Sequence, residues 1–344
     1  MGDPAETTNS PGPPPADGDI PALSARGRTV PEAWERSVLE LWERGARVRT
    51  EYDREGDPPS RDSTMLIVVE EPMAEPRIHL AFPGGVEDLE KYRQEVLFGV
   101  HDHWVRPEEG KWTYTYHQRL TAYAPVADLS SSKVRSPFQP VDQLEYIIGK
   151  LSRSPHSRRA QGITWMPTAD PATDDPPCLQ RIWCRLLPVD GPGAGCRGPG
   201  NDRVPGAGGR ERGAGSVVSG PRPPAPGTRH PDAEYALNLN THWRSRDAYK
   251  AAFMNMYALT DLQRWLAEEI GRRMGRKVAV GRYVDISDSY HIYGAYFQEF
   301  NERFLKLVRE RPFDRRVWRS DDRRVQAAIL AGREQLEKES ARGP

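Results

Sequence analysis

A segment dense in glycine, proline and arginine interrupts the chain between two stretches that alternate apolar and polar residues. Residues 189–232 hold almost nothing that a hydrophobic core could bury, so we expect a disordered insertion there. The stretches on either side of it, 179–187 and 235–239, have the period of two that is typical of β-strands. Two such strands joined by a loop predict a β-hairpin, and the insertion then lies in the loop of that hairpin.

Helical and strand-like patterns alternate along the rest of the chain. Apolar residues recur at helical spacing over 29–44, 87–100, 142–151, 255–274, 291–308 and about 321–340. Further strands are predicted over 64–70, 162–167 and 278–286. Glycines follow two of these helices at the positions of C-terminal caps, Gly45 and Gly275. The elements interleave too irregularly for a doubly wound sheet, so we expect an α+β domain.

The ends of the chain differ in composition from its middle. Proline, glycine and small polar residues dominate the N-terminus, and we expect residues 1–28 to form a disordered tail. One folded domain is expected over 29–318, followed by a C-terminal helix and tail over 319–344. The N-terminus lacks the charged and apolar regions of a signal peptide, and no apolar run has the length of a membrane span. We therefore predict a cytoplasmic protein.

Charge and cysteine content narrow the possible ligands. Lysine plus arginine and aspartate plus glutamate number 49 each, and this balance argues against binding to nucleic acid. The three cysteines, Cys178, Cys184 and Cys196, form no CxxC motif and have no nearby pair of histidines. We therefore expect neither a metal site nor a framework of disulfides.

Cys178 and Arg244 suggest the position of a site. Cys178 follows two prolines and begins the first alternating stretch, so a rigid turn should present its thiol at the mouth of a strand. Arg244 and Ser245 lie at the end of the second alternating stretch. A nucleophile beside an arginine–serine pair suits a nucleotide site, although Cys178 taken alone also fits a buried structural thiol.

Several short motifs occur in the order and rough spacing found in one enzyme family. They are PHSRR, WMPTAD, PPC, RSRD, the asparagine that follows it, and HIY. Together they resemble thymidylate synthase and the related pyrimidine-nucleotide (dCMP or CMP) hydroxymethylases, and the likeness covers roughly residues 30–310. The resemblance implies a divergent member with a thymidylate synthase-like fold, in which a mixed β-sheet packs against helices and a homodimer forms through the sheet. It also implies 5,10-methylenetetrahydrofolate as co-substrate and no metal.

The resemblance assigns the chemical step to Cys178 and its neighbours. The family transfers a one-carbon unit to C5 of a pyrimidine nucleotide, and C5 becomes nucleophilic only after a thiolate adds to C6. Cys178 matches that nucleophile. Arg244 matches the arginine that lowers the thiol pKa and holds the phosphate. Glu95 matches the glutamate that orders water and moves protons, and Tyr116 resembles the active-site tyrosine.

The resemblance also implies a set of residues that bind the phosphate. Arg158 and Arg159 match a pair that reaches the phosphate bound by the neighbouring subunit, and Ser245 adds a hydroxyl donor. The family's arginine loop near the N-terminus is missing from this sequence, and Arg49 is the candidate for its arginine.

The base, the sugar and the folate have candidate residues of their own. Asn255 matches the asparagine that pairs with N3–H and O4 of uracil. His291 and Tyr293 match the pair that bonds the sugar hydroxyl, and Asp247 matches the carboxylate that meets the pterin of the folate. Hydroxymethylases for cytosine nucleotides tend to carry aspartate in place of Asn255, so the sequence favours dUMP.

The chain also departs from the family pattern. Leu179 follows the nucleophile where most members have histidine, Trp243 replaces a glutamine, and the apolar tail that closes over folate is not found at the C-terminus. Without that closure water could capture the C5 intermediate and give a hydroxymethyl group instead of a methyl group. The sequence thus leaves three functions open: synthesis of dTMP from dUMP, 5-hydroxymethylation of dCMP/CMP or dUMP/UMP, and nucleotide or partner binding without catalysis.

Overall fold

The computed structural model of the protein describes residues 18–106, 109, 112–124, 139–189 and 232–342. Most of the predicted N-terminal tail and nearly all of the predicted insertion, including Cys196, lie outside the described residues. The disorder expected for these two segments therefore stays a prediction.

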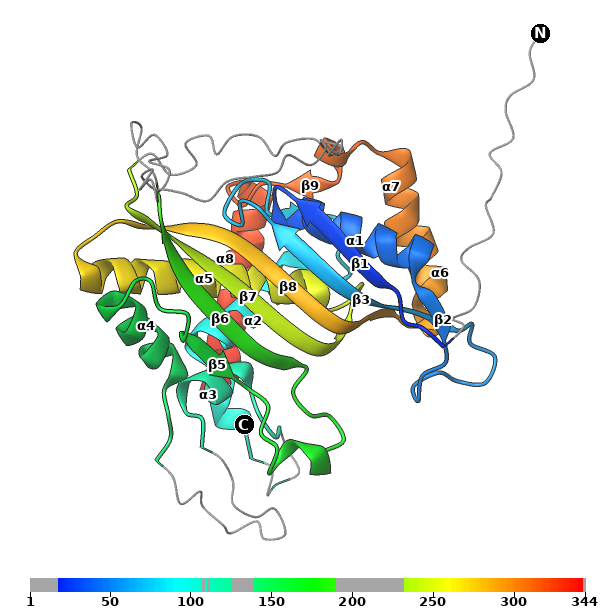
Figure 1. Ribbon diagram of the computed structural model, residues 1–344. Coiled ribbons are helices and arrows are strands. Elements are labelled where there is room, and N and C mark those ends of the chain that lie inside the picture. The colour runs from blue at the N-terminus through cyan, green and yellow to red at the C-terminus, as the bar shows by residue number, and fades with distance from the viewer. Residues whose placement is uncertain (1–17, 107–108, 110–111, 125–138, 190–231, 343–344) are drawn as a thin grey trace, which may run out of the picture.

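A mixed β-sheet forms the centre of the described structure (Figure 1). Its strands run in the order β1–β3–β8–β7–β6–β5, and β2 also pairs with β3. The strand bounds are Ala22–Gly27 for β1, Ala46–Val48 for β2, Ser60–Val69 for β3, Gln161–Ile163 for β5, Leu179–Pro188 for β6, Tyr235–Asp247 for β7 and Val278–Ile292 for β8. A small second sheet joins β4 (Ile78–His79) to β9 (Val317–Trp318).

The hairpin predicted on either side of the insertion is confirmed. β6 and β7 pair antiparallel, with Cys184 opposite Leu239. Alternate residues of both strands are buried, so one face of the sheet points into the core. The register shifts between Leu179 and Arg181, and this irregularity lies directly beside Cys178.

Two β-α-β units place the longest helices against the sheet. β1 and β3 are parallel and are linked through α1 (Val30–Arg44), while β7 and β8 are parallel and are linked through α5 (Ala252–Met274). Parallel neighbours require crossovers of this kind. Figure 1 shows α1, α2 (Val86–Phe98), α5 and α8 (Arg323–Arg342) on the same side of the sheet. The predicted α+β class, with a mixed sheet packed against helices, is confirmed.

α1 begins where the sequence provides a cap. The Thr29 side chain accepts a hydrogen bond from the Glu32 backbone N–H at 3.4 Å, and Pro31 occupies the first turn, where a missing N–H is tolerated. Trp34 is fully buried, and its Nε1 donates to the backbone carbonyl of Ala248 at 2.8 Å. This bond ties α1 to the segment that follows β7.

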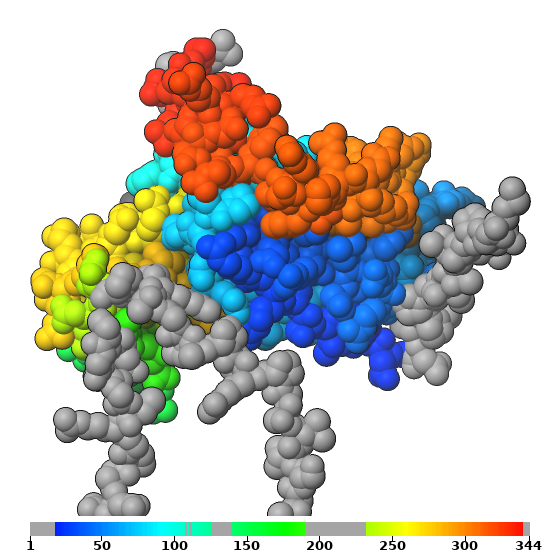
Figure 2. Space-filling model, turned by 90° about the horizontal axis from the view of Figure 1, so that it is seen from above, coloured from blue at the N-terminus to red at the C-terminus, as the bar shows by residue number. Residues whose placement is uncertain are grey.

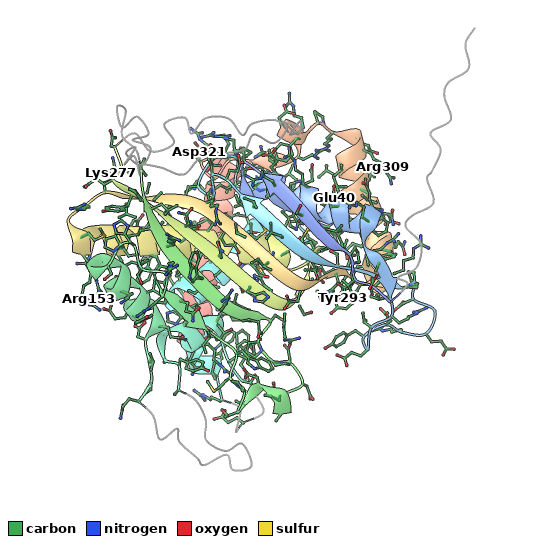
Figure 3. All side chains as sticks on the ribbon, in the orientation of Figure 1. Glu40, Arg153, Lys277, Tyr293, Arg309 and Asp321 are labelled. Carbon is green, nitrogen blue, oxygen red and sulfur yellow. The ribbon has the colours of Figure 1, made fainter. Side chains whose placement is uncertain are left out.

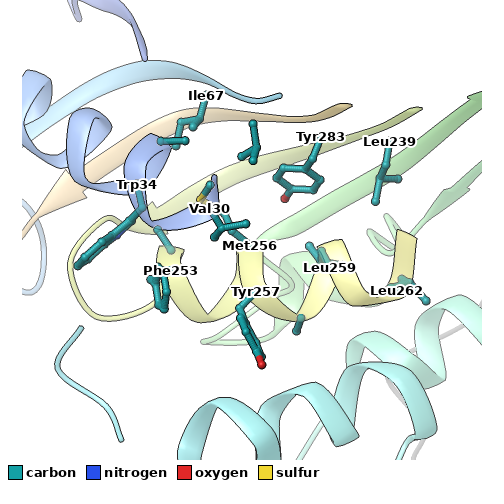
Figure 4. Close-up of a cluster of buried hydrophobic side chains, with 14 of the residues drawn as sticks. Val30, Trp34, Ile67, Leu239, Phe253, Met256, Tyr257, Leu259, Leu262 and Tyr283 are labelled. Atoms are coloured by element: carbon teal, nitrogen blue, oxygen red, sulfur yellow. The ribbon is translucent and has the colours of Figure 1, made fainter. Parts of the chain in front are cut away.

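Apolar side chains of α5 fill the space between that helix, α1 and the sheet (Figure 4). Phe253, Met256, Leu259 and Leu262 recur at helical spacing and are all buried. Opposite them lie side chains of α1 and of the sheet: Val30, Trp34, Ile67, Leu239 and Tyr283. Burial of each large apolar side chain stabilises the fold by about 2 kcal/mol, so this cluster fixes α5 firmly beneath β7 and β8.

Among the element starts that differ from the predictions, two change the description of the fold. Residues 22–27, which we assigned to the disordered tail, form β1, because Leu23 and Ala25 turn into the core while the backbone pairs with β3. α5 begins at Ala252, earlier than predicted, so Asn255 lies within its first turn. Both differences reflect packing against the sheet, which a local pattern does not reveal.

The segment predicted as one helix over 291–308 is divided. Its first residues, His291 and Ile292, continue β8, because they pair with β3. Helix follows as α6 (Phe297–Phe300), a π-helical turn over 301–305, and α7 (Lys306–Glu310). His291 is therefore placed at the end of a strand and not on a helix.

The C-terminal helix α8 packs against α2. A Cβ atom at Gly332 would meet the backbone carbonyl oxygen of Glu87 at 2.9 Å, so the two helices approach closely there. Arg333 Nε also donates to Glu90 Oε1 at 2.7 Å. From above, the orange and red C-terminal segment forms one flank of the molecule beside the blue and cyan elements (Figure 2).

Two shorter helices complete the fold near the site. α3 spans Tyr116–Thr121 and α4 spans Gln143–Arg153. The apolar residues at helical spacing on α4 are all buried: Leu144, Ile147, Ile148 and Leu151. Within the ranges that the structure describes, no helix is long and apolar enough to cross a membrane.

Candidate functional site

Arg244 holds the turn that presents Cys178. Its Nη2 donates to the carbonyl of Pro176 at 2.7 Å, and its Nε donates to that of Pro177 at 3.2 Å. The backbone N–H of Arg244 donates to the Cys178 carbonyl at 2.9 Å. A guanidinium and an amide thus fix the Pro-Pro turn against β7, and the partly buried thiol lies directly before β6.

Burial dominates the ionisation of Cys178. It raises the pKa of the thiol, while the guanidinium groups of Arg244 and Arg246 lower it and Asp175 raises it. Arg244 acts in the direction expected from the sequence, but the pKa stays raised because burial contributes more. The thiol is therefore mostly protonated at neutral pH, and thiolate chemistry needs a proton acceptor or more positive charge nearby.

Two tyrosines flank the thiol. The Tyr116 hydroxyl accepts a hydrogen bond from the Leu179 backbone N–H at 3.3 Å, which places it beside Cys178. The rings of Tyr114 and Tyr116 have centroids 5.7 Å apart. Burial raises the pKa of both phenols, and the Cys178 charge raises it further. Both hydroxyls therefore keep their protons at neutral pH and can donate hydrogen bonds near the thiol.

Asn255 is joined to α2 through a tyrosine. Its Nδ2 donates to the Tyr92 hydroxyl at 2.7 Å, and Asn255 is only 6% exposed. Burial raises the pKa of Tyr92, with a further contribution from Glu95. A protonated phenol and a fixed amide therefore lie together between α2 and the start of α5.

Glu95 lies on α2 one turn beyond Tyr92 and faces a cavity. Burial raises the pKa of its carboxyl group, and the neighbouring Asp102 raises it too, whereas His101 lowers it. The cavity has a volume of about 760 Å³, and its lining includes Trp112, Tyr114, Tyr116, Asp174 and Asp175. Its size is within the range of pockets that hold small organic ligands. A carboxyl group with a raised pKa in a cavity is suited to proton transfer.

His101 connects Glu95 to the C-terminal helix. His101 Nδ1 is 2.8 Å from Glu95 Oε2, and its Nε2 is 3.8 Å from Glu339 Oε2 of α8. The imidazole stacks on Trp104 with ring centroids 4.0 Å apart. This stacking holds the His101 ring in a defined plane beside the Glu95 carboxyl group.

Asp247 ends β7 and is bound by backbone donors. Its Oδ1 accepts hydrogen bonds from the N–H groups of Tyr249 at 2.9 Å and Lys250 at 2.8 Å. Burial nevertheless raises the pKa of Asp247 to about 6. Near that pH the carboxyl group can either accept or donate a hydrogen bond to a ligand.

His291 and Tyr293 lie together at the end of β8. Their ring centroids are 4.5 Å apart in an edge-on arrangement, and the Tyr293 ring also meets that of Tyr52 at 5.8 Å. His291 is 5% exposed, and burial lowers its pKa to about 4, so the imidazole is neutral at neutral pH. Figure 3 shows Tyr293 where β8 leaves the sheet.

The ends of β6, β7 and β8 bring most of the predicted residues into one region. Burial raises the pKa of Tyr293, and the nearby Asp247 and Cys178 raise it further, which puts the candidates for binding the sugar close to the thiol. Ser245 is half-buried and pairs in register with Ser289 of β8. Through the contacts above, the region includes Glu95, Tyr116, Cys178, Arg244, Ser245, Asp247, Asn255, His291 and Tyr293.

Two predicted arginines, Arg158 and Arg159, make no described contact with this region. Arg158 and Arg159 are exposed between α4 and β5, where their backbone carbonyls accept hydrogen bonds from side chains of the same chain. In Figure 3 Arg153, at the end of α4, lies at the left of the view, and Tyr293 lies at the right. Arg49 is exposed on the loop that also carries Tyr52, and its Nη1 donates to the Asp57 carbonyl at 2.6 Å.

The sequence analysis missed three residues of the site: Tyr92, Tyr114 and His101. Tyr92 has the spacing of an apolar core residue on α2, and its spacing from Glu95 puts both on one face of the helix. Tyr114 lies within an aromatic stretch that has no clear period. His101 reaches Glu95 because the chain turns back at Gly99, which has a φ of 61°. A Cβ atom at Gly99 would also meet His117 Nδ1 at 2.2 Å, so the turn needs glycine.

Sequence comparison supplies relatives with a common name, although no family model matches the chain. A Methanosarcina mazei protein named "Putative thymidylate synthase" is 32% identical over 154 residues, which are 45% of this chain and 59% of that protein. The Methanosarcina barkeri protein of the same name is 28% identical over 268 residues, or 78% and 88% of the two chains. That of Methanothermobacter thermautotrophicus is 24% identical over 295 residues, or 82% and 98%. The chain thus matches only 59% of the length of the first of these relatives.

Structure comparison finds thymidylate synthase A of Bacillus subtilis, a thermostable enzyme. It is 15% identical with a TM-score of 0.46, and the match covers 80% of this chain and 84% of that one.

The fold and the site define an α+β protein with a cysteine, an arginine and a histidine at the ends of neighbouring strands. The resemblance predicted from the short motifs is confirmed by the sequence relatives. The chain is a divergent relative of the archaeal proteins that carry the thymidylate synthase name.

Proposed function

We propose that this protein transfers a one-carbon unit from methylenetetrahydrofolate to C5 of a pyrimidine nucleotide and converts dUMP to dTMP. The supporting observation is the arrangement of Cys178 on a turn held by Arg244, beside the cavity that Glu95 lines. The relatives named thymidylate synthase support the same family of reactions. The folate supplies the methylene carbon and, for a methyl product, the hydride.

Cys178 starts the reaction in this proposal. Its thiol proton leaves, favoured by the positive charge of Arg244, and the thiolate forms a bond to C6 of the pyrimidine. The electron pair of the C5–C6 double bond then moves toward O4, and C5 becomes the nucleophile. Hydrogen-bond donors near O4 stabilise this charge, and the Asn255 amide is the candidate donor.

Glu95 accepts the proton that C5 loses during the transfer. Its raised pKa brings the carboxyl group closer to neutral pH, where it can accept a proton and pass it on. The Glu95–His101 contact gives the proton a second acceptor at 2.8 Å. In the same sequence C5 bonds to the methylene carbon, the carbon–nitrogen bond to the folate breaks, and hydride from the folate converts the methylene to a methyl group. Elimination of the thiolate then restores the C5–C6 double bond and frees Cys178, with dihydrofolate as the second product.

Asn255 supports uracil as the base. Its Nδ2 already donates one hydrogen bond to Tyr92, which fixes the orientation of the amide. The amide oxygen can then accept from uracil N3–H, and the second N–H can donate to O4. Cytosine presents the opposite donor and acceptor pattern at these two atoms.

A homodimer through the sheet is part of the proposal. The helices cover one face of the sheet (Figure 1), while Leu66, Ile163 and Leu187 are 40%, 39% and 45% exposed on the other. A second copy on that face would cover these side chains. It would also explain why Arg158 and Arg159 point to solvent in their own chain, because they would then serve the phosphate of the partner.

One incubation tests the reaction. Protein and methylenetetrahydrofolate are mixed with dUMP, UMP, dCMP or CMP, and dihydrofolate formation and nucleotide mass are followed together. Dihydrofolate and a methyl mass gain on dUMP support the proposal, and Cys178→Ala should abolish both. A hydroxymethyl gain without dihydrofolate makes the protein a pyrimidine-nucleotide 5-hydroxymethylase. No modification of any nucleotide rejects the enzymatic proposal.

A further inference from the structure

An aspartate, a serine and a histidine form a chain of contacts across β3 and β8. Asp62 and His291 lie opposite each other in the antiparallel register. The Ser289 hydroxyl donates to Asp62 Oδ2 at 2.8 Å, and the Ser289 Oγ atom also lies 3.3 Å from His291 Nδ1. None of the roles above uses Asp62 or Ser289.

The direction of the hydrogen bonds follows from the number of protons. A serine hydroxyl has one proton, and here it is donated to the Asp62 carboxylate. The Ser289 oxygen can therefore only accept from His291, which requires a proton on Nδ1. A neutral imidazole with its proton on Nδ1 has a bare lone pair on Nε2.

The bare nitrogen has no partner within the chain that the structure describes. His291 Nε2 is buried and makes no hydrogen bond to any described residue. Buried polar atoms are almost always paired, so an unpaired acceptor beside Tyr293 points to a ligand that donates. A hydroxyl group satisfies this requirement, whereas an ether or a phosphate oxygen does not.

We propose that Asp62 and Ser289 are positioning residues that hold His291 in the Nδ1–H tautomer, so that its Nε2 accepts a hydrogen bond from a sugar hydroxyl of the nucleotide. The inference deepens the proposed function and rests on it for the identity of the ligand. The hydrogen bond to Nε2 makes the site selective for nucleotides whose sugar has a free hydroxyl facing His291.

The tautomer can be measured without any substrate. Protein labelled with ¹⁵N in histidine gives two ring-nitrogen signals for His291, which are assigned by their loss in His291→Gln. In the native protein, Nδ1 should have the shift of a protonated nitrogen and Nε2 that of a bare one. Asp62→Asn should move the population toward the Nε2–H tautomer, because the amide can donate to Ser289 and free its hydroxyl to donate to Nδ1. A proton on Nε2 in the native protein, or spectra that Asp62→Asn and Ser289→Ala leave unchanged, would overturn the proposal.

The ligand is tested by calorimetric titration with dUMP and with its 3′-deoxy analogue. Asp62→Asn and Ser289→Ala should each weaken dUMP binding about tenfold, the loss of one good hydrogen bond. Both should change binding of the analogue by less than about twofold. Ser63→Ala is the matched control, since Ser63 is a fully buried serine beside Asp62 whose hydroxyl has no partner among the described residues.

The two experiments separate the inference from the proposed function. Equal losses for dUMP and the analogue would mean that Asp62 and Ser289 act only structurally, and the inference would fail. If native protein shows the Nδ1–H tautomer but binds neither nucleotide, the proposed function fails and the sugar hydroxyl with it. Circular dichroism of each variant confirms that the fold is kept.

Discussion

The amide of Asn255 donates a hydrogen bond to the hydroxyl of Tyr92 across 2.7 Å. This bond joins α5 to α2, and Glu95 lies on α2 one turn beyond Tyr92. Tyr92 therefore connects Asn255, proposed to bind the base, to the helix that carries Glu95, proposed to transfer the proton of C5. Removing the link should affect substrate recognition more than folding.

Tyr92→Phe should weaken dUMP binding about five- to tenfold. The ring still fills its place, but Asn255 loses the acceptor that orients its amide, and one hydrogen bond contributes about 1 kcal/mol. Titration calorimetry with dUMP measures the effect, and Tyr257→Phe, another buried tyrosine between these helices, is the control. Unchanged affinity in Tyr92→Phe would show that the bond does not orient Asn255.

His101→Gln should reduce turnover about tenfold at neutral pH and move the rate optimum to higher pH. Glutamine keeps a polar side chain but not the imidazole hydrogen bond and charge through which His101 lowers the pKa of Glu95, so burial then raises that pKa further. The pH profile of turnover with dUMP measures this. His103→Gln is the control, because His103 lies on the same short turn but is exposed. A uniform loss of rate at all pH values would contradict a role for His101 in the ionisation of Glu95.

Much of the fold could be predicted because the alternation of apolar and polar residues indicates strands of a sheet with one buried face. The strands around the insertion show this, since each alternate residue of β6 and β7 packs inward. β1 was missed because its ALSARG sequence offers a single strong apolar residue, Leu23, next to a stretch rich in proline and glycine. Its pairing with β3 depends on contacts far along the chain.

Part of the candidate site could also be predicted from the sequence, and part could not. Cys178, Arg244 and Asn255 could be proposed from short motifs in a fixed order. The Asp62–Ser289–His291 contacts could not, because they depend on the register of β3 against β8. Nor could the net pKa of Cys178, since burial of the thiol outweighs the nearby guanidinium groups.

Alkylation of Cys178 should be slow at neutral pH and should accelerate as the pH rises past 9. Burial raises the pKa of the thiol, and iodoacetamide reacts with the thiolate. Arg244→Gln should shift the profile to still higher pH, because it removes the charge that most lowers this pKa. Mass spectrometry of Cys196→Ser protein follows the reaction, and buried Cys184, whose pKa burial raises to about 12, serves as the internal reference. Rapid alkylation of Cys178 at pH 7 would contradict this account.

Asp62→Asn should stabilise the fold above pH 6 while it weakens nucleotide binding. Burial raises the pKa of Asp62 to about 6 from 3.8. The folded state therefore favours the protonated form, and the resulting stabilisation, full below the unfolded pKa of 3.8, is lost as the pH rises through 6. A shift of this size corresponds to at most about 3 kcal/mol.

Urea unfolding at pH 4.5 and pH 7.5 measures this effect. The difference in free energy of unfolding between Asp62→Asn and native protein should be small at the lower pH and favour the variant at the higher one. Asp288→Asn is the control, because the Asp288 side chain is 58% exposed. A variant less stable than native protein at pH 7.5 would mean that the ionised Asp62 stabilises the fold.

Mixed dimers should recover activity from two inactive variants. Cys178→Ala lacks the proposed nucleophile, and Arg158→Ala/Arg159→Ala lacks the exposed arginines proposed to reach the partner's phosphate. A heterodimer has one site with an intact Cys178 and arginines donated by the Cys178→Ala chain, so mixing should restore up to about one quarter of native turnover, since half of the dimers are mixed and each has one complete site. Subunit exchange is checked with differently tagged chains, and Arg272→Ala, an exposed arginine on α5, controls for loss of surface charge. No recovery after confirmed exchange would show that Arg158 and Arg159 act within their own chain or not at all.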